Sequence, residues 1–305
     1  MIFFALTASA ATPPTFELHP FLAGETGVIS GDDGTHGYAT LRRARGLVFA
    51  HLPDEGLTAM LQVELAGPAP ALLDGRVDVK VSDALTLAVG QQVVTVSRAW
   101  NTPLHLVGLG DRGLANNTFT PGRRLGAYAR LHEGAVRAEL GVFHPGGDDI
   151  PPFPMVAMRM ELGSPGARPW VEQPARTGDT SGVAVGIGGL VNPGTVDDVR
   201  GMGTLDVAAH THGFSAFGEV FGARDGELTA GGMVQVGQLL PVGWLDVVAR
   251  GDAVEDALHD VGYRATLGVG AYRHGADCVV RLQGFVGAGS REGEAGAKVY
   301  TQVRM

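Results

Sequence analysis

Apolar and polar side chains alternate with a period of two near the end of the chain. In residues 261–274, Ala265 and Leu267 fall on one face of an extended chain, and Arg264 and Thr266 fall on the other. Residues 278–287 and 294–305 repeat this pattern. Because successive side chains of a strand point to opposite faces, these stretches predict strands with one apolar face and one face of Arg, Lys, Gln, Tyr and Gly. A membrane barrel places such an apolar face on lipid and the polar face on a water-filled lumen.

Similar strand-like segments follow one another along the whole chain, and no long amphipathic helix interrupts them. About sixteen segments can be distinguished: 16–23, 39–51, 57–65, 71–81, 84–90, 123–132, 135–143, 155–162, 182–191, 200–209, 214–222, 229–239, 244–250, 262–272, 278–287 and 294–305. An even number of strands of ~10 residues is typical of bacterial barrels. The predicted fold class is therefore all-β: a transmembrane antiparallel β-barrel of about 16 strands, formed as one domain by residues 15–305. Residues 163–181 depart from this pattern, because the connection is long where a short turn is due.

Composition fits a barrel wall better than a soluble enzyme. The chain has 305 residues with 47 glycines and 7% aromatic residues, a net charge of −9 and a single cysteine. The negative charge gives no indication of nucleic-acid binding, and Cys278 alone excludes an intrachain disulfide. No run reaches the ~20 apolar residues of a membrane-spanning helix. Residues 1–14 are expected to be the remnant of a secretory leader, because an apolar stretch is followed by small residues; the alternative is a buried first strand.

The alternation also assigns charged side chains to the lumen. Arg43 and Arg45 share a face, and two Arg side chains in hydrocarbon would each cost ~2–4 kcal/mol, so both are predicted to point inward. Arg42 then falls on the lipid face, near the rim. The remaining inward cations are Arg76, Lys80, Arg124, Arg130, Arg137, Arg159, Arg250, Arg264, Arg281, Lys298 and Arg304, and the inward acids are Glu64, Asp78, Glu139, Glu161, Asp206, Glu219 and Asp246.

These assignments give about thirteen inward cations and about seven inward anions, so a negative chain is expected to have a positive bore. Arg-lined pores favour anions and phosphates, and the planar Arg fork matches phosphate oxygens. The alternative is that the Arg side chains pair with the inward acids and only brace the wall.

The stretch 108–113 fits GxGxxG but has no strand–helix unit around it, and His210 and His212 have no acidic third ligand placed near them. No metal site and no cofactor are predicted.

Several stretches, in this order and spacing, resemble the phosphate-selective porin O and P family of outer-membrane channels. They are LRRARGLVFAHLPDEG, PALLDGRVDVKVSDALTLAVGQ, DRGLANNTFTPGRRLGAYARLHEGAVRAELGVFHPGG, GGMVQVGQLLPVGWLDVVARGDAV and the closing strands. The resemblance implies a sixteen-stranded, usually trimeric channel with an arginine ladder in its bore. It also implies a phosphate filter that uses Lys. This chain has Lys only at Lys80 and Lys298, which favours a moderate anion preference over a tight phosphate site.

The longest loop, residues 91–122, follows the fifth strand and is therefore the third outer loop. Loops of this length inside compact domains are usually functional or disordered. In many porins the third outer loop folds into the barrel and narrows it, so Trp100, His105, Asp111 and Arg112 are predicted to form a constriction. The alternative is an ordinary exposed loop.

Together these features predict a diffusion porin of the bacterial outer membrane that prefers small anionic solutes, is not an enzyme, and contacts the lipid bilayer and lipopolysaccharide, as a homotrimer. Two other classes stay open: an outer-membrane barrel enzyme, which would need a Ser/His/Asp set at one rim, and a non-conducting structural barrel with a plugged lumen. Small inward residues argue against a filled bore: Ala184, Gly186, Gly188, Gly268 and Gly270.

Overall fold

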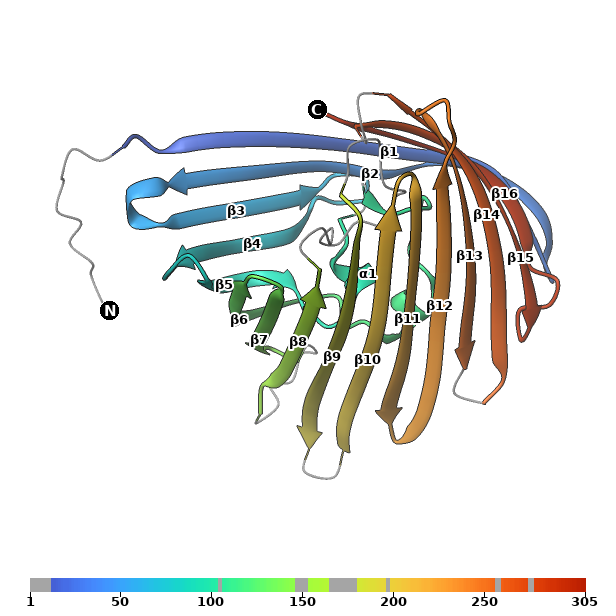
Figure 1. Ribbon diagram of the computed structural model, residues 1–305. Helices are drawn as coiled ribbons and strands as arrows, with labels where there is room; N and C mark the ends of the chain where they lie inside the picture. The colour runs from blue at the N-terminus through green and yellow to red at the C-terminus, as the bar shows by residue number, and fades with distance from the viewer. Residues whose placement is uncertain are drawn as a thin grey trace.

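Sixteen antiparallel strands close into one barrel in the computed structural model (Figure 1). The structure describes residues 12–103, 106–145, 153–164, 180–195, 198–255, 259–273 and 277–305, without the side chains of 194, 195, 198, 199 and 225. The strands are β1 (Thr15–Gly31), β2 (Gly34–Leu52), β3 (Leu57–Glu64), β4 (Ala71–Lys80), β5 (Leu85–Val93), β6 (Arg123–Glu133), β7 (Val136–Phe143), β8 (Met155–Gly163), β9 (Gly182–Thr195), β10 (Asp198–Thr211), β11 (Phe214–Asp225), β12 (Glu227–Leu239), β13 (Leu245–Glu255), β14 (Val261–Arg273), β15 (Cys278–Gly289) and β16 (Ala295–Arg304).

Each predicted segment corresponds to one of these strands, so the predicted fold is confirmed. Every strand pairs with its sequence neighbours, and β1 also pairs with β16, which closes the sheet. The predicted number of strands is also correct around residues 163–181, because β8 and β9, which flank this stretch, pair directly with each other. Closure gives every strand two neighbouring strands, which is how a sheet satisfies its backbone groups in lipid. The expected leader at residues 1–14 lies mostly outside the described residues and stays a prediction.

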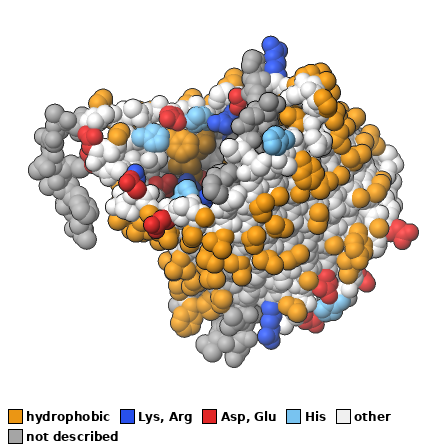
Figure 2. Space-filling model, viewed as in Figure 1, with side chains coloured by type: hydrophobic (Ala, Val, Ile, Leu, Met, Phe, Trp, Pro, Cys, Tyr) orange, Lys and Arg blue, Asp and Glu red, His pale blue; other side chains and the backbone are white. Residues whose placement is uncertain are grey.

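Alternation gives the wall two different faces. Leu205, Val220, Val234, Leu267 and Leu282 are each more than half exposed on the outer surface. Hydrophobic side chains are spread over the outside of the barrel (Figure 2). Such an extensive apolar exterior is unusual on a protein surrounded by water and is the surface that a barrel presents to lipid. No helix among the described residues has the length and hydrophobicity needed to cross a membrane.

A β-bulge reverses one sequence-based assignment. The pairing of β1 with β2 slips between Ala23 and Gly24, so that Ala23 faces Arg43 while Gly24 faces Leu41. Arg42 is the extra residue, and a bulge of this kind turns the side chains that follow to the other face. The prediction that Arg42 faces lipid is therefore wrong: its Nη1 donates to Oε1 of Glu25 at 2.8 Å, inside the barrel.

The interior contains the segment between β5 and β6, with two short helices, α1 (Arg98–Asn101) and α2 (Leu114–Phe119). Figure 1 shows α1 among the strands rather than beyond their ends. Buried apolar side chains of this segment, including Val94, Val96 and Leu114, pack with Tyr128 and Phe143 of the wall. The largest hydrophobic cluster thus lies inside the barrel, between this segment and the wall. A further short helix, η1 (Pro53–Glu55), forms the turn between β2 and β3.

Candidate functional site

One buried carboxylate fixes the start of the internal segment to the opposite wall. Glu219, on β11, accepts hydrogen bonds from Oγ of Ser97 at 2.9 Å and from the backbone N–H groups of Arg98 and Ala99 at 3.0 and 3.3 Å. Nδ2 of Asn116 at 3.2 Å and Oγ1 of Thr204 at 3.0 Å complete the set. Ser97 also caps α1, since its Oγ accepts from the Trp100 N–H at 3.1 Å. A carboxylate with this many donors holds the segment in one position.

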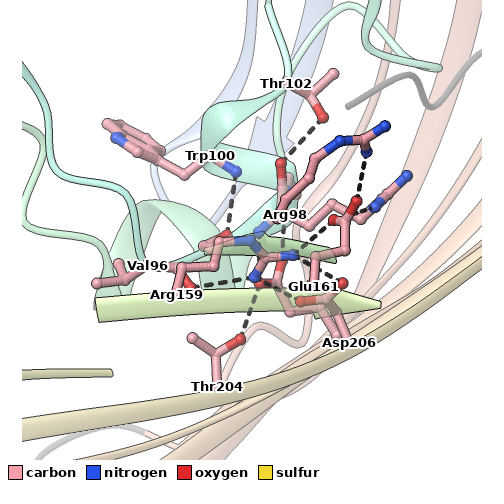
Figure 3. A network of polar contacts seen from close by, with 12 residues as sticks. Val96, Arg98, Trp100, Thr102, Arg159, Glu161, Thr204 and Asp206 are labelled. Atoms are coloured by element: carbon pink, nitrogen blue, oxygen red, sulfur yellow. Dashed lines mark hydrogen bonds and ion pairs between the residues drawn. The ribbon is translucent and has the colours of Figure 1, made fainter. Parts of the chain in front are cut away.

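A chain of alternating charges continues from this contact along the wall (Figure 3). Nη1 of Arg98 donates to Oε2 of Glu161 at 2.6 Å, and Nη1 of Arg137 donates to Oε1 of the same carboxylate at 2.8 Å. Arg159 binds Asp206 through both Nη atoms, at 2.7 and 3.1 Å. Apart from the more accessible Arg137, these side chains are almost completely buried. Buried charges are tolerated when they are paired and hydrogen-bonded, so this region is a brace rather than an open path.

The other end of the segment is fixed through Asp111. Its Oδ2 accepts from Nζ of Lys298 at 3.0 Å and its Oδ1 from Nε2 of Gln283 at 3.2 Å, while Nη2 of Arg250 lies 3.7 Å away. Burial by itself raises the pKa of the Asp111 carboxyl. The opposing effect of the positive charges of Arg250 and Lys298 is larger, so the pKa falls from 3.8 to about 2. Nearby, the Leu114 N–H donates to Oδ1 of Asp252 at 3.0 Å. Both ends of the segment are therefore held by polar and charged groups of the wall.

Small residues on the wall make room for this segment instead of leaving the lumen open. A Cβ at Gly188 would overlap the Val96 carbonyl oxygen, and a Cβ at Gly268 would lie 2.7 Å from Cδ2 of Leu109. At Gly186 and Gly270 a Cβ would meet the Arg159–Asp206 and Arg281–Asp246 pairs. The argument that these glycines, together with the buried Ala184, keep the bore open is therefore wrong for this part of the barrel. The absence of a Cβ here allows close packing.

Most of the predicted pore cations are bound to acids. Besides the residues of Figure 3, the ion pairs are Arg45–Glu64 at 2.7 Å, Arg76–Asp78 at 3.1 Å, Arg130–Glu139 at 2.8 Å, Arg250–Asp252 at 2.9 Å, Arg264–Glu294 at 3.0 Å and Arg281–Asp246 at 3.0 Å. Lys80 is the exposed last residue of β4 and pairs with Asp83. Arg124 donates to the carbonyl oxygens of Arg123 and Pro145, at 2.9 and 3.3 Å. These contacts match the alternative in which Arg side chains brace the wall.

Sequence reasoning missed several of the partners. Glu25 lies beyond the end of the predicted first segment. Asp74, which pairs with Arg123 at 3.0 Å, lies beside a second irregularity, in the register between β3 and β4. Alternation alone could have found Asp252, which lies two residues after Arg250 on the same face. Arg98 and Asp111 belong to the internal segment, and no periodic pattern predicts their contacts.

A cavity of about 480 Å³ is left between the internal segment and the part of the wall formed by β1–β6 and β16. Five of its lining residues are arginines and one is an acid: Arg43, Arg45, Arg112, Arg123, Arg304 and Asp74. Arg43 donates from Nη1 to the Arg42 carbonyl at 2.6 Å, and its buried Nε has no hydrogen-bond partner among the described residues. Figure 2 shows a hollow in this part of the molecule, with hydrophobic side chains inside it and His and charged side chains around it.

The internal segment contributes Trp100 and Arg112 to this cavity. The guanidinium of Arg112 lies 4.6 Å from the centre of the Trp100 ring and donates to the carbonyl oxygens of Ala99, Trp100 and Thr102, at 3.1, 2.9 and 2.8 Å. These contacts fix its position. Asp111 points to Lys298 rather than into the cavity, and His105 lies outside the described residues.

Solved bacterial outer-membrane proteins share this fold. A loop-deletion mutant of the outer membrane protein OmpT of Vibrio cholerae is 13% identical with a TM-score of 0.69, over 96% of this chain and 99% of that one. The anion-selective porin from Comamonas acidovorans is 10% identical with a TM-score of 0.66, over 96% and 100%. A triple mutant of the Rhodopseudomonas blastica porin is 13% identical with a TM-score of 0.66, over 95% and 100%. No family model and no curated protein matches the chain.

Proposed function

We propose that this chain is a diffusion porin of the bacterial outer membrane that passes small hydrophilic solutes with a moderate preference for anions. The barrel is closed and apolar outside, and structures of the same fold include proteins described as porins. The internal segment narrows the bore and confines solutes to the side of β1–β6 and β16. Homotrimer formation and contact with lipopolysaccharide belong to the same proposal, and one similar structure is described as a trimer form.

The charge of the cavity carries the anion preference. Five arginines and one aspartate line it, whereas the cations elsewhere on the wall are largely neutralised by bound acids. Glu64 neutralises part of the charge of Arg45, and Asp74 part of that of Arg123. Charges in a cleft with low-dielectric walls add to one potential and concentrate the counter-ion. A partly compensated cluster favours moderate selectivity, and phosphate is one candidate anion rather than a tightly bound ligand.

Single-channel recording in a planar bilayer tests this proposal. In a potassium chloride gradient, the zero-current potential should have the sign of an anion-preferring pore, and the current should scale with salt concentration. A correctly folded protein that inserts but does not conduct would instead support a non-conducting structural barrel. A zero-current potential of the opposite sign would show that the arginines act only as braces.

A further inference from the structure

The cavity has a second property that a passage for hydrated inorganic ions does not require. The lumen-facing side of a channel barrel is usually polar. Here the lumen-facing positions after the bulge in β2 continue from Arg43 and Arg45 to Leu47 and Phe49, and Met60 faces Phe49 from β3. Phe21 of β1 and Trp100 of the internal segment also line the cavity. One region of the lumen therefore combines an arginine cluster with an apolar and aromatic wall.

The aromatic part of this wall is ordered by contacts between rings. His19 meets Phe49 edge to face, with ring centres 5.8 Å apart, and His51 stacks on Phe49 at 5.9 Å. The neighbouring positions on the outer face, Val48 and Leu61, are exposed to the lipid side instead. The apolar stripe inside the barrel is thus separate from the lipid-facing surface, and a lipid contact does not explain it.

Polar groups at the same cavity are left without partners. The Nε of Arg43, the indole Nε1 of Trp100 and both amide atoms of Asn101 are buried and make no hydrogen bond within the described residues. Buried donors without partners are rare unless a ligand or water satisfies them. Three of these groups are donors, and because they are buried, an anionic oxygen in the cavity would contact them only after a side-chain movement.

We infer that the cavity binds organic carboxylates that carry an aromatic or bulky apolar body. The carboxylate lies at the guanidinium cluster that includes Arg43, and the apolar body lies against Phe49, Leu47 and Met60. A volume of about 480 Å³ is in the usual range for small-molecule sites. Inorganic phosphate or chloride would use the arginines but gain nothing from the apolar wall. This inference rests on the proposed function, because it names the class of anion that the proposed pore selects.

The test compares benzoate, acetate and inorganic phosphate as inhibitors of the chloride current through the reconstituted protein. Benzoate should halve the current at a concentration about tenfold or more below that of acetate, because burying the ring stabilises the complex. Phosphate should resemble acetate rather than benzoate. Equal half-inhibiting concentrations for benzoate and acetate, in a channel that conducts and prefers anions, would overturn the inference and leave the proposed function standing. A protein that does not conduct, or prefers cations, would overturn both.

Variants separate the two halves of the site. Phe49→Gln should raise the half-inhibiting concentration of benzoate to about that of acetate, because the apolar contact with the ring is lost. Arg43→Gln should weaken inhibition by both carboxylates. Phe285→Gln is the matched control, because Phe285 lies under the guanidinium of Arg264, outside the cavity, and should leave benzoate inhibition unchanged. If Phe49→Gln does not fold, a series from acetate to butyrate to benzoate on the unchanged protein replaces it; inhibition that does not strengthen along the series contradicts the inference.

Discussion

The hydroxyl of Ser97 donates a hydrogen bond of 2.9 Å to Glu219, although the two residues lie 122 positions apart and both are almost completely buried. This contact joins the internal segment to the wall strand β11. The same hydroxyl accepts a hydrogen bond from the Trp100 N–H, so one oxygen atom caps the N-terminus of α1 and also attaches this helix to the barrel wall. The position of the segment, and with it the shape of the remaining lumen, depends on this carboxylate.

Replacing Glu219 should therefore release the segment. Glu219→Leu leaves Ser97, Asn116, Thr204 and two backbone N–H groups without their acceptor, and unsatisfied buried donors cost about 1–3 kcal/mol each. We expect a lower unfolding temperature, higher conductance and more current noise. Thr204→Val removes one donor only and serves as the control with a smaller effect. Unchanged conductance in folded Glu219→Leu would show that the segment does not limit the current.

Gly188 should be intolerant of any larger residue. A Cβ at this position would lie only 1.9 Å from the carbonyl oxygen of Val96, which belongs to the internal segment. Gly188→Val is expected to displace the segment and raise conductance, as measured in single channels. Gly203→Val on the neighbouring strand is the control, because nothing lies within 4 Å of a Cβ there. Equal conductance of the two variants would contradict this packing argument.

Acid should weaken the anchor at Asp111 only at very low pH. The pKa of this carboxyl is lowered from 3.8 to about 2 in the folded protein. Such a group stabilises the native state above its unfolded pKa and loses this contribution as the pH falls through the folded value. We expect conductance to stay constant down to about pH 4 and to change between about pH 4 and pH 2. Asp111→Asn should show the altered conductance at neutral pH already, and a variant indistinguishable from the parent at all pH values would remove Asp111 from this role.

Selectivity should depend on Arg43 more than on Arg124. Arg43 lines the cavity, whereas Arg124 donates to two backbone carbonyls and does not line it. Arg43→Glu is expected to move the zero-current potential toward cations, and Arg124→Glu to move it less, because the guanidinium of Arg124 is held at the backbone carbonyls of Arg123 and Pro145 and does not line the cavity. The measurement is the zero-current potential of each variant in the same salt gradient. A larger shift for Arg124→Glu would place the selective region elsewhere.

The sequence by itself determined the number, order and approximate limits of the strands, because the period of two between lipid-facing and lumen-facing residues is a local property. It also placed charged side chains such as Arg45, Arg159 and Glu219 inside the barrel, because hydrocarbon excludes them. Only the tertiary structure decided where a bulge interrupts that period, as at Arg42, and which acid lies beside which arginine. Only the tertiary structure showed that the internal segment packs against Gly188 and that Phe49 faces the same cavity as Arg43. Such contacts join positions far apart in the chain, and they depend on register and barrel closure, which no local pattern encodes.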